Sequence, residues 1–273
     1  MNRRDALGLL AAAPLLGGWR WPFGREEIRR TSLIVAGSSR MLPYNRDIET
    51  IFEAANPDID VVCEGGGSYP ALLALKRGLI DVAAISEELT RHDDDPRLRL
   101  HLVAKDAVAL IVSPQNPVTS VGRNDLRDIL EGRLANWGML GGPDSEIDLV
   151  DRRGGDPTDR AEAVEAVLGH HEPFKNVETY VGSDDEMIRA VAANPNALGY
   201  CGWEDLTPDV RALAVGGVAL SRETMLSGSY PFAWPYYYVT LGAPSPIISR
   251  FLAFTRTDEV QTMLAKGGLL RVY

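Results

Sequence analysis

The chain has 273 residues and a formal net charge of -10 at pH 7, with 45% hydrophobic and 24% charged residues. This composition is typical of a globular protein, and the length suffices for one large α/β domain or for two lobes that each bury a core. The acidic balance argues against nucleic acid as a partner, because affinity for a phosphate backbone depends on clustered Lys and Arg. A small anion is not excluded, since a recessed site responds to local dipoles and donors.

The N-terminus has the pattern of an export signal. Residues 2–18 combine a charged start with an apolar run, and Arg3 and Arg4 stand side by side. Pro14 inside the run disfavours an ordinary buried helix. We therefore predict an export signal and linker over 1–30, a periplasmic location, and no membrane span after processing, because no apolar stretch reaches the required length. The arginine pair favours the twin-arginine route, with the general route as the alternative.

After this segment, apolar runs rich in β-branched residues alternate with stretches of helical period, which is typical of βαβ units and a mostly parallel sheet. The predicted strands are 32–36, 61–64, 81–85, 107–112, 147–150, 198–201 and 236–241. The predicted helices contain Ile48 to Ala55, 124–131, 157–168, 184–191 and a last helical region from Ile248 to Leu264. The fold class is therefore α/β.

The order of these elements predicts two lobes. Two prolines within 113–117 mark a candidate hinge. If the last helical region returns to the first half, the chain crosses between lobes twice and can close around a ligand by hinge motion. We predict lobe 1 at 31–112 plus 236–273 and lobe 2 at 113–235, each a mostly parallel sheet flanked by helices.

Three turns rich in small residues each precede a predicted helix, at 36–40, 64–68 and 152–158. The free backbone N–H groups at the start of a helix attract anions. One such turn alone is also ordinary loop chemistry. Three in one chain, with Arg152 and Arg153 in the last of them, favour an anion-binding site.

Other chemistries lack their motifs. No GxxxxGK[ST] occurs, and the turn at 64–68 has no lysine to reach a nucleotide's phosphates. A hydrolase would need a nucleophile motif such as GxSxG, which is absent. Cys63 and Cys201 form no CxxC pair, and no histidines have metal-ligand spacing, which argues against zinc. The two cysteines either pair in an oxidising compartment or are two buried thiols.

Six short segments carry motifs of one known family. They are Ala-Gly-Ser-Ser-Arg-Met at 36–41, Gly-Gly-Gly-Ser at 65–68, Gly-Leu-Ile-Asp-Val-Ala-Ala-Ile-Ser at 78–86, Ala-Asn-Trp at 135–137 followed by Gly-Gly at 141–142, Leu-Gly-Tyr at 198–200 and Tyr-Pro-Phe at 230–232. From about residue 32 to the C-terminus, the chain resembles the phosphate-binding components of ABC importers, the PstS-like proteins of the type II periplasmic binding fold.

The resemblance implies a two-lobed, exported, monomeric protein that captures inorganic phosphate or a similar small oxyanion between its lobes. It also implies delivery of the ligand to an inner-membrane ABC permease, with no enzymatic activity and no cofactor. One alternative stays open. A divergent relative with weak or no phosphate affinity would serve as a sensor or as an interaction protein.

The resemblance further implies which residues contact the ligand. They are Ser38, Ser39, Arg40, Gly67, Ser68, Ser86, Arg152, Asp156 and Thr158. Serine hydroxyls and backbone N–H groups would donate to the oxyanion, and the planar fork of Arg152 would bind two oxygens at once. The alternatives are plain helix capping for the serines and a surface ion pair for Arg152.

Two departures from the family add negative charge near the expected anion. Asp156-Pro157 replaces the usual Ser-Gly before Thr158, and Ser86 is followed by Glu87. Asp156 would either cap the helix in competition with the ligand or accept a hydrogen bond from a protonated phosphate oxygen. At about 4 Å its repulsion costs roughly 4 kcal/mol per unit charge at an effective dielectric of about 20. A charge-assisted hydrogen bond returns only about 1.5–3 kcal/mol, so we expect weakened phosphate binding.

Overall fold

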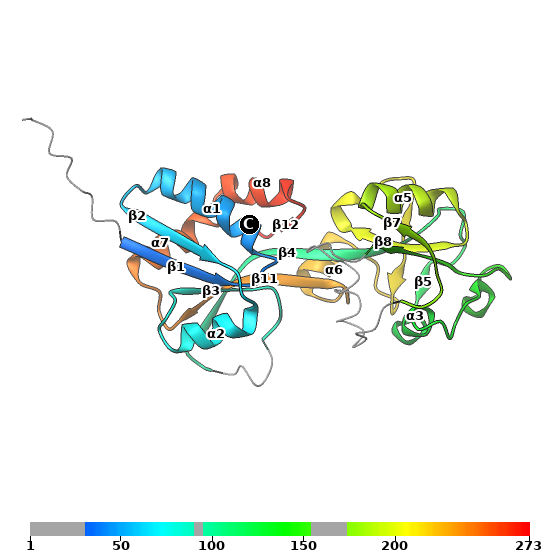
Figure 1. Ribbon diagram of the computed structural model, residues 1–273, viewed down its shortest axis with the longest axis horizontal. Coiled ribbons are helices and arrows are strands. Elements are labelled where there is room, and N and C mark those ends of the chain that lie inside the picture. Colours follow the sequence, from blue (N-terminus) through cyan, green and yellow to red (C-terminus); the bar gives the residue numbers. More distant parts are fainter. Residues whose placement is uncertain (1–30, 90–94, 154–173) are drawn as a thin grey trace, which may run out of the picture.

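The computed structural model describes residues 31–89, 95–153 and 174–273. In these parts of the chain, helices and strands gather into two lobes joined by two long strands, β4 (Leu98–Val112) and β11 (Ala233–Leu241) (Figure 1). Each lobe has its own cluster of buried hydrophobic side chains.

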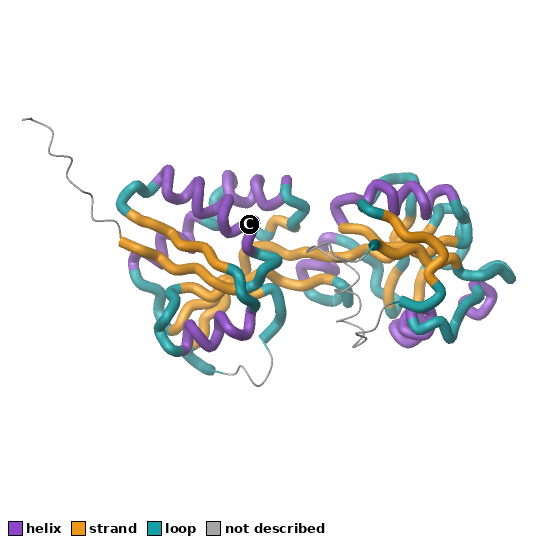
Figure 2. Tube along the Cα trace, viewed as in Figure 1, coloured by secondary structure: helices purple, strands orange, loops and turns teal. Residues whose placement is uncertain are grey.

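The first lobe is built on a sheet in the order β2-β1-β3-β11-β4. Its other elements are β1 (Thr31–Gly37), α1 (Leu42–Ala55), β2 (Ile59–Glu64), α2 (Ser68–Lys76), β3 (Val82–Ile85), α7 (Pro246–Phe254) and α8 (Asp258–Lys266). β1 pairs in parallel with β2 and β3, and β11 is antiparallel to β3. α1, α7 and α8 share one buried cluster with this sheet, while α2 packs in another (Figure 2). Ile48 and Phe52, one helical turn apart, are fully buried, as the period of the sequence predicts.

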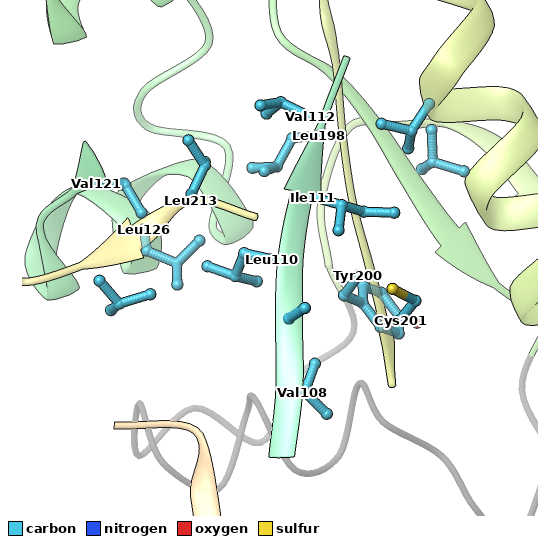
Figure 3. Close-up of a cluster of buried hydrophobic side chains, with 14 of the residues drawn as sticks. Val108, Leu110, Ile111, Val112, Val121, Leu126, Leu198, Tyr200, Cys201 and Leu213 are labelled. Carbon is cyan, nitrogen blue, oxygen red and sulfur yellow. The ribbon is translucent and has the colours of Figure 1, made fainter. Parts of the chain in front are cut away.

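The second lobe continues the sheet in the order β4-β8-β6-β7. Its elements are β5 (Ser120–Val121), α3 (Arg123–Leu130), η2 (Trp137–Leu140), β6 (Asp148–Arg152), β7 (Val177–Val181), α5 (Asp184–Ala193), β8 (Ala197–Gly202), η3 (Trp203–Asp205), β9 (Arg211–Ala212) and β10 (Ala214–Val215). β6 is parallel to β7 and β8. Leu110 and Ile111 point to opposite sides of β4, so this end of the strand lies inside the core (Figure 3).

The two lobes meet along β4. From Leu98 to Ala107 this strand pairs with β11, and from Val108 to Val112 it pairs with β8. Two short elements lie beside it: β12 (Leu270–Arg271), which pairs with β4, and α6 (Arg222–Ser227), whose Met225 carbonyl accepts a hydrogen bond from Lys105 Nζ at 2.9 Å. Opposite Lys105, β11 has Pro235, and the register of the ladder shifts just after it.

The candidate hinge at 113–117 forms a packed turn, and its role in lobe movement stays a prediction. Ser113 and Asn116 are buried, and the Asn116 side chain donates to Pro195 O at 3.0 Å and accepts from the Val118 N–H at 3.0 Å. These contacts make the segment a packed turn at the end of β4. Its prolines end a strand, whereas the lobes are joined earlier, within the strand itself.

The predicted α/β class with two lobes and two crossings is confirmed. Each lobe has a parallel centre, and the crossing strands are antiparallel to their neighbours. β4 begins at Leu98 rather than at residue 107, and β7 was not predicted. The predicted helix at 157–168 lies outside the described residues. The division into 31–112 plus 236–273 and 113–235 stays a prediction of which residues move together.

The two cysteines are buried in different cores, Cys63 in the first lobe and Cys201 in the second, and neither forms a disulfide. The alternative of a disulfide between them is therefore wrong. Within residues 31–89, 95–153 and 174–273, no helix has both the length and the apolar character of a membrane span.

Candidate functional site

Three buried serines meet where elements of the first lobe end or begin. Ser38 follows β1, Ser86 follows β3 and Ser68 begins α2. Their exposed fractions are 5%, 6% and 7%. Ser38 Oγ lies 2.8 Å from Ser86 Oγ, and the Ser86 N–H donates to Ser68 Oγ at 3.4 Å. We call Ser38, Ser68 and Ser86 the serine cluster.

Glycines allow these three elements to approach one another. Gly37 lies so close to β3 that a Cβ atom would overlap the Ala84 carbonyl oxygen. The next residue, Ser38, donates its N–H to the same oxygen at 2.8 Å. Gly67 has a φ of +97°, where side chains are strained, and donates its N–H to Gly37 O at 2.9 Å. Both glycines thus bring the end of β1 against the start of α2.

The serine cluster has donors to spare. In the contacts of the described residues, the pair of Ser38 and Ser86 uses one hydroxyl proton, and Ser68 Oγ acts as an acceptor. A serine hydroxyl carries one proton and two acceptor lone pairs, so two protons remain for another acceptor. α2 has no side-chain cap on its first N–H groups. Hydroxyl protons and the positive end of a helix therefore converge at this point.

Ser39 and Arg40 complete the turn after β1. Ser39 is exposed and lies next to Gly65 of the second turn. Arg40 donates its N–H to Ser38 Oγ at 3.2 Å. Its guanidinium carbon lies 5.8 Å from the ring centroid of Trp234 in β11, within the range of a cation–π interaction. Arg40 thus has its backbone N–H at the serine cluster and its positive charge at β11.

Arg152 lies at the end of β6 in the second lobe, and its side chain is only 8% exposed. Arg152 Nη2 is 3.8 Å from Asp184 Oδ1, in the first turn of α5. The Arg152 N–H donates to Asp151 Oδ1 at 2.8 Å and to the Tyr200 hydroxyl oxygen at 3.2 Å, and that hydroxyl donates to Asp151 at 2.6 Å. Backbone and side chain of Arg152 are therefore both held in place.

Comparisons with known proteins agree with this architecture. The profile of the PBP superfamily domain matches residues 25–259. The phosphate-binding protein PstS of Bacillus subtilis (strain 168) is 30% identical over 240 residues, which are 86% of this chain and 79% of that protein. The chain belongs to the PstS family.

Solved structures of similar proteins support the fold. PstS from Borrelia burgdorferi superposes with a TM-score of 0.78 at 21% identity, over 89% of this chain and 99% of that one. A putative phosphate ABC transporter substrate-binding protein from Clostridium perfringens, solved with bound phosphate, gives a TM-score of 0.56 at 26% identity, over 89% and 100% of the two chains. The resemblance to PstS-like proteins expected from the motifs is confirmed.

Of the ligand contacts expected from the PstS-like motifs, the structure brings the first-lobe residues together. Ser38, Ser68 and Ser86 form one hydrogen-bonded chain beside Gly67, with Ser39 and Arg40 in the adjoining turn. Arg152 lies on the second lobe, and none of its described contacts reaches the serine cluster. Asp156 and Thr158 lie outside the described residues. Glu87, one of the acidic departures, is exposed.

Three residues of this site were missed from the sequence. Asp184 stands behind the N-cap Ser183 and looks like ordinary helix-start chemistry. Tyr200 lies in a buried strand, where a tyrosine is normally a core residue. Trp234 shows no motif at all. Only the acidic cluster at the start of α5, at the same sheet edge as Arg152, was a usable signal.

Proposed function

We propose that this chain is an exported solute-binding protein that captures inorganic phosphate, or a similar small oxyanion, between its lobes for an ABC-type importer. The observation that carries the proposal is the serine cluster at the start of α2, where spare hydroxyl protons and helix N–H groups converge. Membership of the PstS family supports phosphate as the ligand.

The proposed site takes donors from both lobes. A tetrahedral oxyanion carries acceptors in all directions, so it can contact two facing surfaces and favour their approach by hinge closure. The first lobe would contribute Ser38, Ser39, Arg40, Gly67, Ser68 and Ser86. The second would contribute the forked guanidinium of Arg152, which suits two oxygens at once, together with Asp156 and Thr158.

The positive charge of Arg152 is already compensated within the second lobe. The Arg152 guanidinium faces the Asp184 carboxylate at 3.8 Å, so the buried positive charge already has a counter-ion. Neutral hydroxyl and backbone donors must then supply much of the attraction. We propose that the site selects its ligand by the number and direction of hydrogen bonds more than by total charge.

The cellular part of the proposal follows the N-terminal sequence and the family. Export by the twin-arginine route would place a monomeric protein in the periplasm, where it would hand its ligand to an inner-membrane ABC permease without catalysing a reaction. The names of the relatives, phosphate-binding proteins from two organisms, favour this role over a sensor with weak affinity.

Calorimetry with phosphate, sulfate, nitrate and acetate tests the proposal. Phosphate should bind most tightly to the purified full chain. Ser38→Ala and Ser68→Ala should each weaken binding by about tenfold, because a lost hydrogen bond to a charged group costs about 1.5–3 kcal/mol. Ser32→Ala, an exposed serine in β1, is the matched control and should change nothing. If no anion binds, or if the cluster variants bind as wild type, the proposal fails.

A further inference from the structure

Trp234 lies where the two lobes meet. It belongs to β11, opposite Asp106 of β4. Its partly buried indole packs against the hydrophobic core of the first lobe and against that of the second. A change in the contacts of this ring therefore affects the packing of both hydrophobic cores.

Arg40 connects this ring to the serine cluster. Its backbone N–H donates to Ser38 Oγ at 3.2 Å, while its guanidinium carbon lies 5.8 Å from the Trp234 ring centroid. The same charge reaches Tyr236, two residues further along β11. Burial raises the pKa of the Tyr236 hydroxyl and Asp106 raises it further, whereas Arg40 acts in the opposite direction. Arg40 thus contacts both the serine cluster and β11, one of the two strands that cross between the lobes.

We propose that Arg40 couples occupancy of the anion site to the movement of the lobes by exchanging its cation–π contact with Trp234 for a contact with the bound anion. The proposal rests on the proposed function, since it needs an anion at the serine cluster. A guanidinium over an aromatic ring at a partly exposed site is held weakly, and a charge-assisted hydrogen bond to an anion is stronger. Binding of the anion therefore draws the guanidinium away from Trp234.

Through this exchange, ligand binding shifts the equilibrium between the two arrangements of the lobes. A ligand shifts a conformational equilibrium only through contacts that differ between the two states. In this proposal the Arg40 guanidinium has a different partner in each state: the Trp234 indole in one and the anion in the other. Because Trp234 packs against both cores, releasing its cation changes the contacts where the two lobes meet.

Tryptophan fluorescence and calorimetry, both as phosphate is added to the full chain, test the coupling. The chain has five tryptophans, so the Trp234 signal is the difference between wild type and Trp234→Phe. We expect phosphate to change wild-type emission, and Trp234→Phe to abolish most of that change while it still binds phosphate. In Arg40→Gln, phosphate affinity should fall about fivefold, and the emission change at saturation should fall to about a fifth or less, because no cation leaves the ring. Arg40→Lys should restore much of the change.

Arg46→Gln is the matched control, since it removes an exposed positive charge from α1. It should leave both affinity and emission unchanged. If phosphate binds and Arg40→Gln keeps the full emission change, or if wild-type emission does not respond, the coupling is overturned while the proposed function stands. If calorimetry detects no anion binding to the wild type, the proposed function fails, and the coupling with it.

Discussion

Arg152 is a buried cation with a fixed counter-ion, and its forked geometry makes it the strongest single donor of the proposed site. We expect Arg152→Ala to weaken phosphate binding at least tenfold, which corresponds to about 1.4 kcal/mol. Arg152→Lys should also bind more weakly, because an ammonium cannot reproduce the planar fork. Calorimetry measures both. The exposed neighbour Arg153 is the control, and Arg153→Ala should bind as wild type. Equal affinity of wild type and Arg152→Ala would remove the role from this residue.

His101 in β4 predicts a pH dependence of stability. Its Nε2 lies 3.2 Å from Thr240 Oγ1, and burial, followed by the positive charge of Arg256, lowers its pKa below 6.5. The unfolded chain therefore binds a proton at a higher pH than the native one, so the free energy of unfolding falls as the pH drops from about 7 through the native pKa.

Urea denaturation of wild type and His101→Gln between about pH 5 and 7 measures this contribution. The variant should lose less stability than wild type over that range. Arg256→Gln should shift the wild-type behaviour in the same direction, because it removes one of the two causes of the lowered pKa. A parallel fall for all three proteins would show that His101 does not titrate differently on folding.

At the scale of elements, the junction of β1, β3 and α2 depends on Gly37. A Cβ atom there would overlap the Ala84 carbonyl, which belongs to a paired strand and cannot move aside. We expect Gly37→Ala to lower the free energy of unfolding by about 2 kcal/mol or more. Gly182→Ala is the control, since its Cβ would meet only the end of the Glu186 side chain. Similar urea midpoints for the two variants would contradict the close approach.

The sequence predicted this junction better than the crossing. In turns 36–40 and 64–68, small residues precede a stretch of helical period. This local pattern predicts a turn followed by a helix. The first part of β4 carries no such signal, because Arg99, His101 and Lys105 interrupt its apolar pattern. The pairing of Arg152 with Asp184 joins segments that only the parallel sheet brings together, so the acidic start of α5 is its one local signal among the described residues.

At the scale of the whole molecule, we expect the affinity for phosphate to depend on the charge of the phosphate ion. Asp156 stands where the PstS-like motif has a ligand-contacting serine, and from that position we expect its carboxylate to repel a phosphate dianion more than a monoanion. We expect phosphate affinity to fall as the pH rises from about 6 to 8, across the second phosphate pKa of about 6 to 7. Asp156→Ser should tighten binding and flatten this slope in calorimetry. Tight, pH-independent binding by wild type, weakened by the substitution, would instead make Asp156 a selective acceptor.

The paired strands β4 and β11 constrain how the two lobes can move relative to each other. A two-stranded antiparallel ribbon twists readily but resists sliding of one strand along the other, because its ladder bonds would break together. Pro235 cannot donate to this ladder, and the register shift after it interrupts the ladder again. The β4–β11 ladder is therefore weakest over these few residues, directly beside Trp234, while β12 pairs with the other edge of β4 there. We expect closure of the lobes to twist this short stretch, so that each donor of one lobe moves along an arc towards the other.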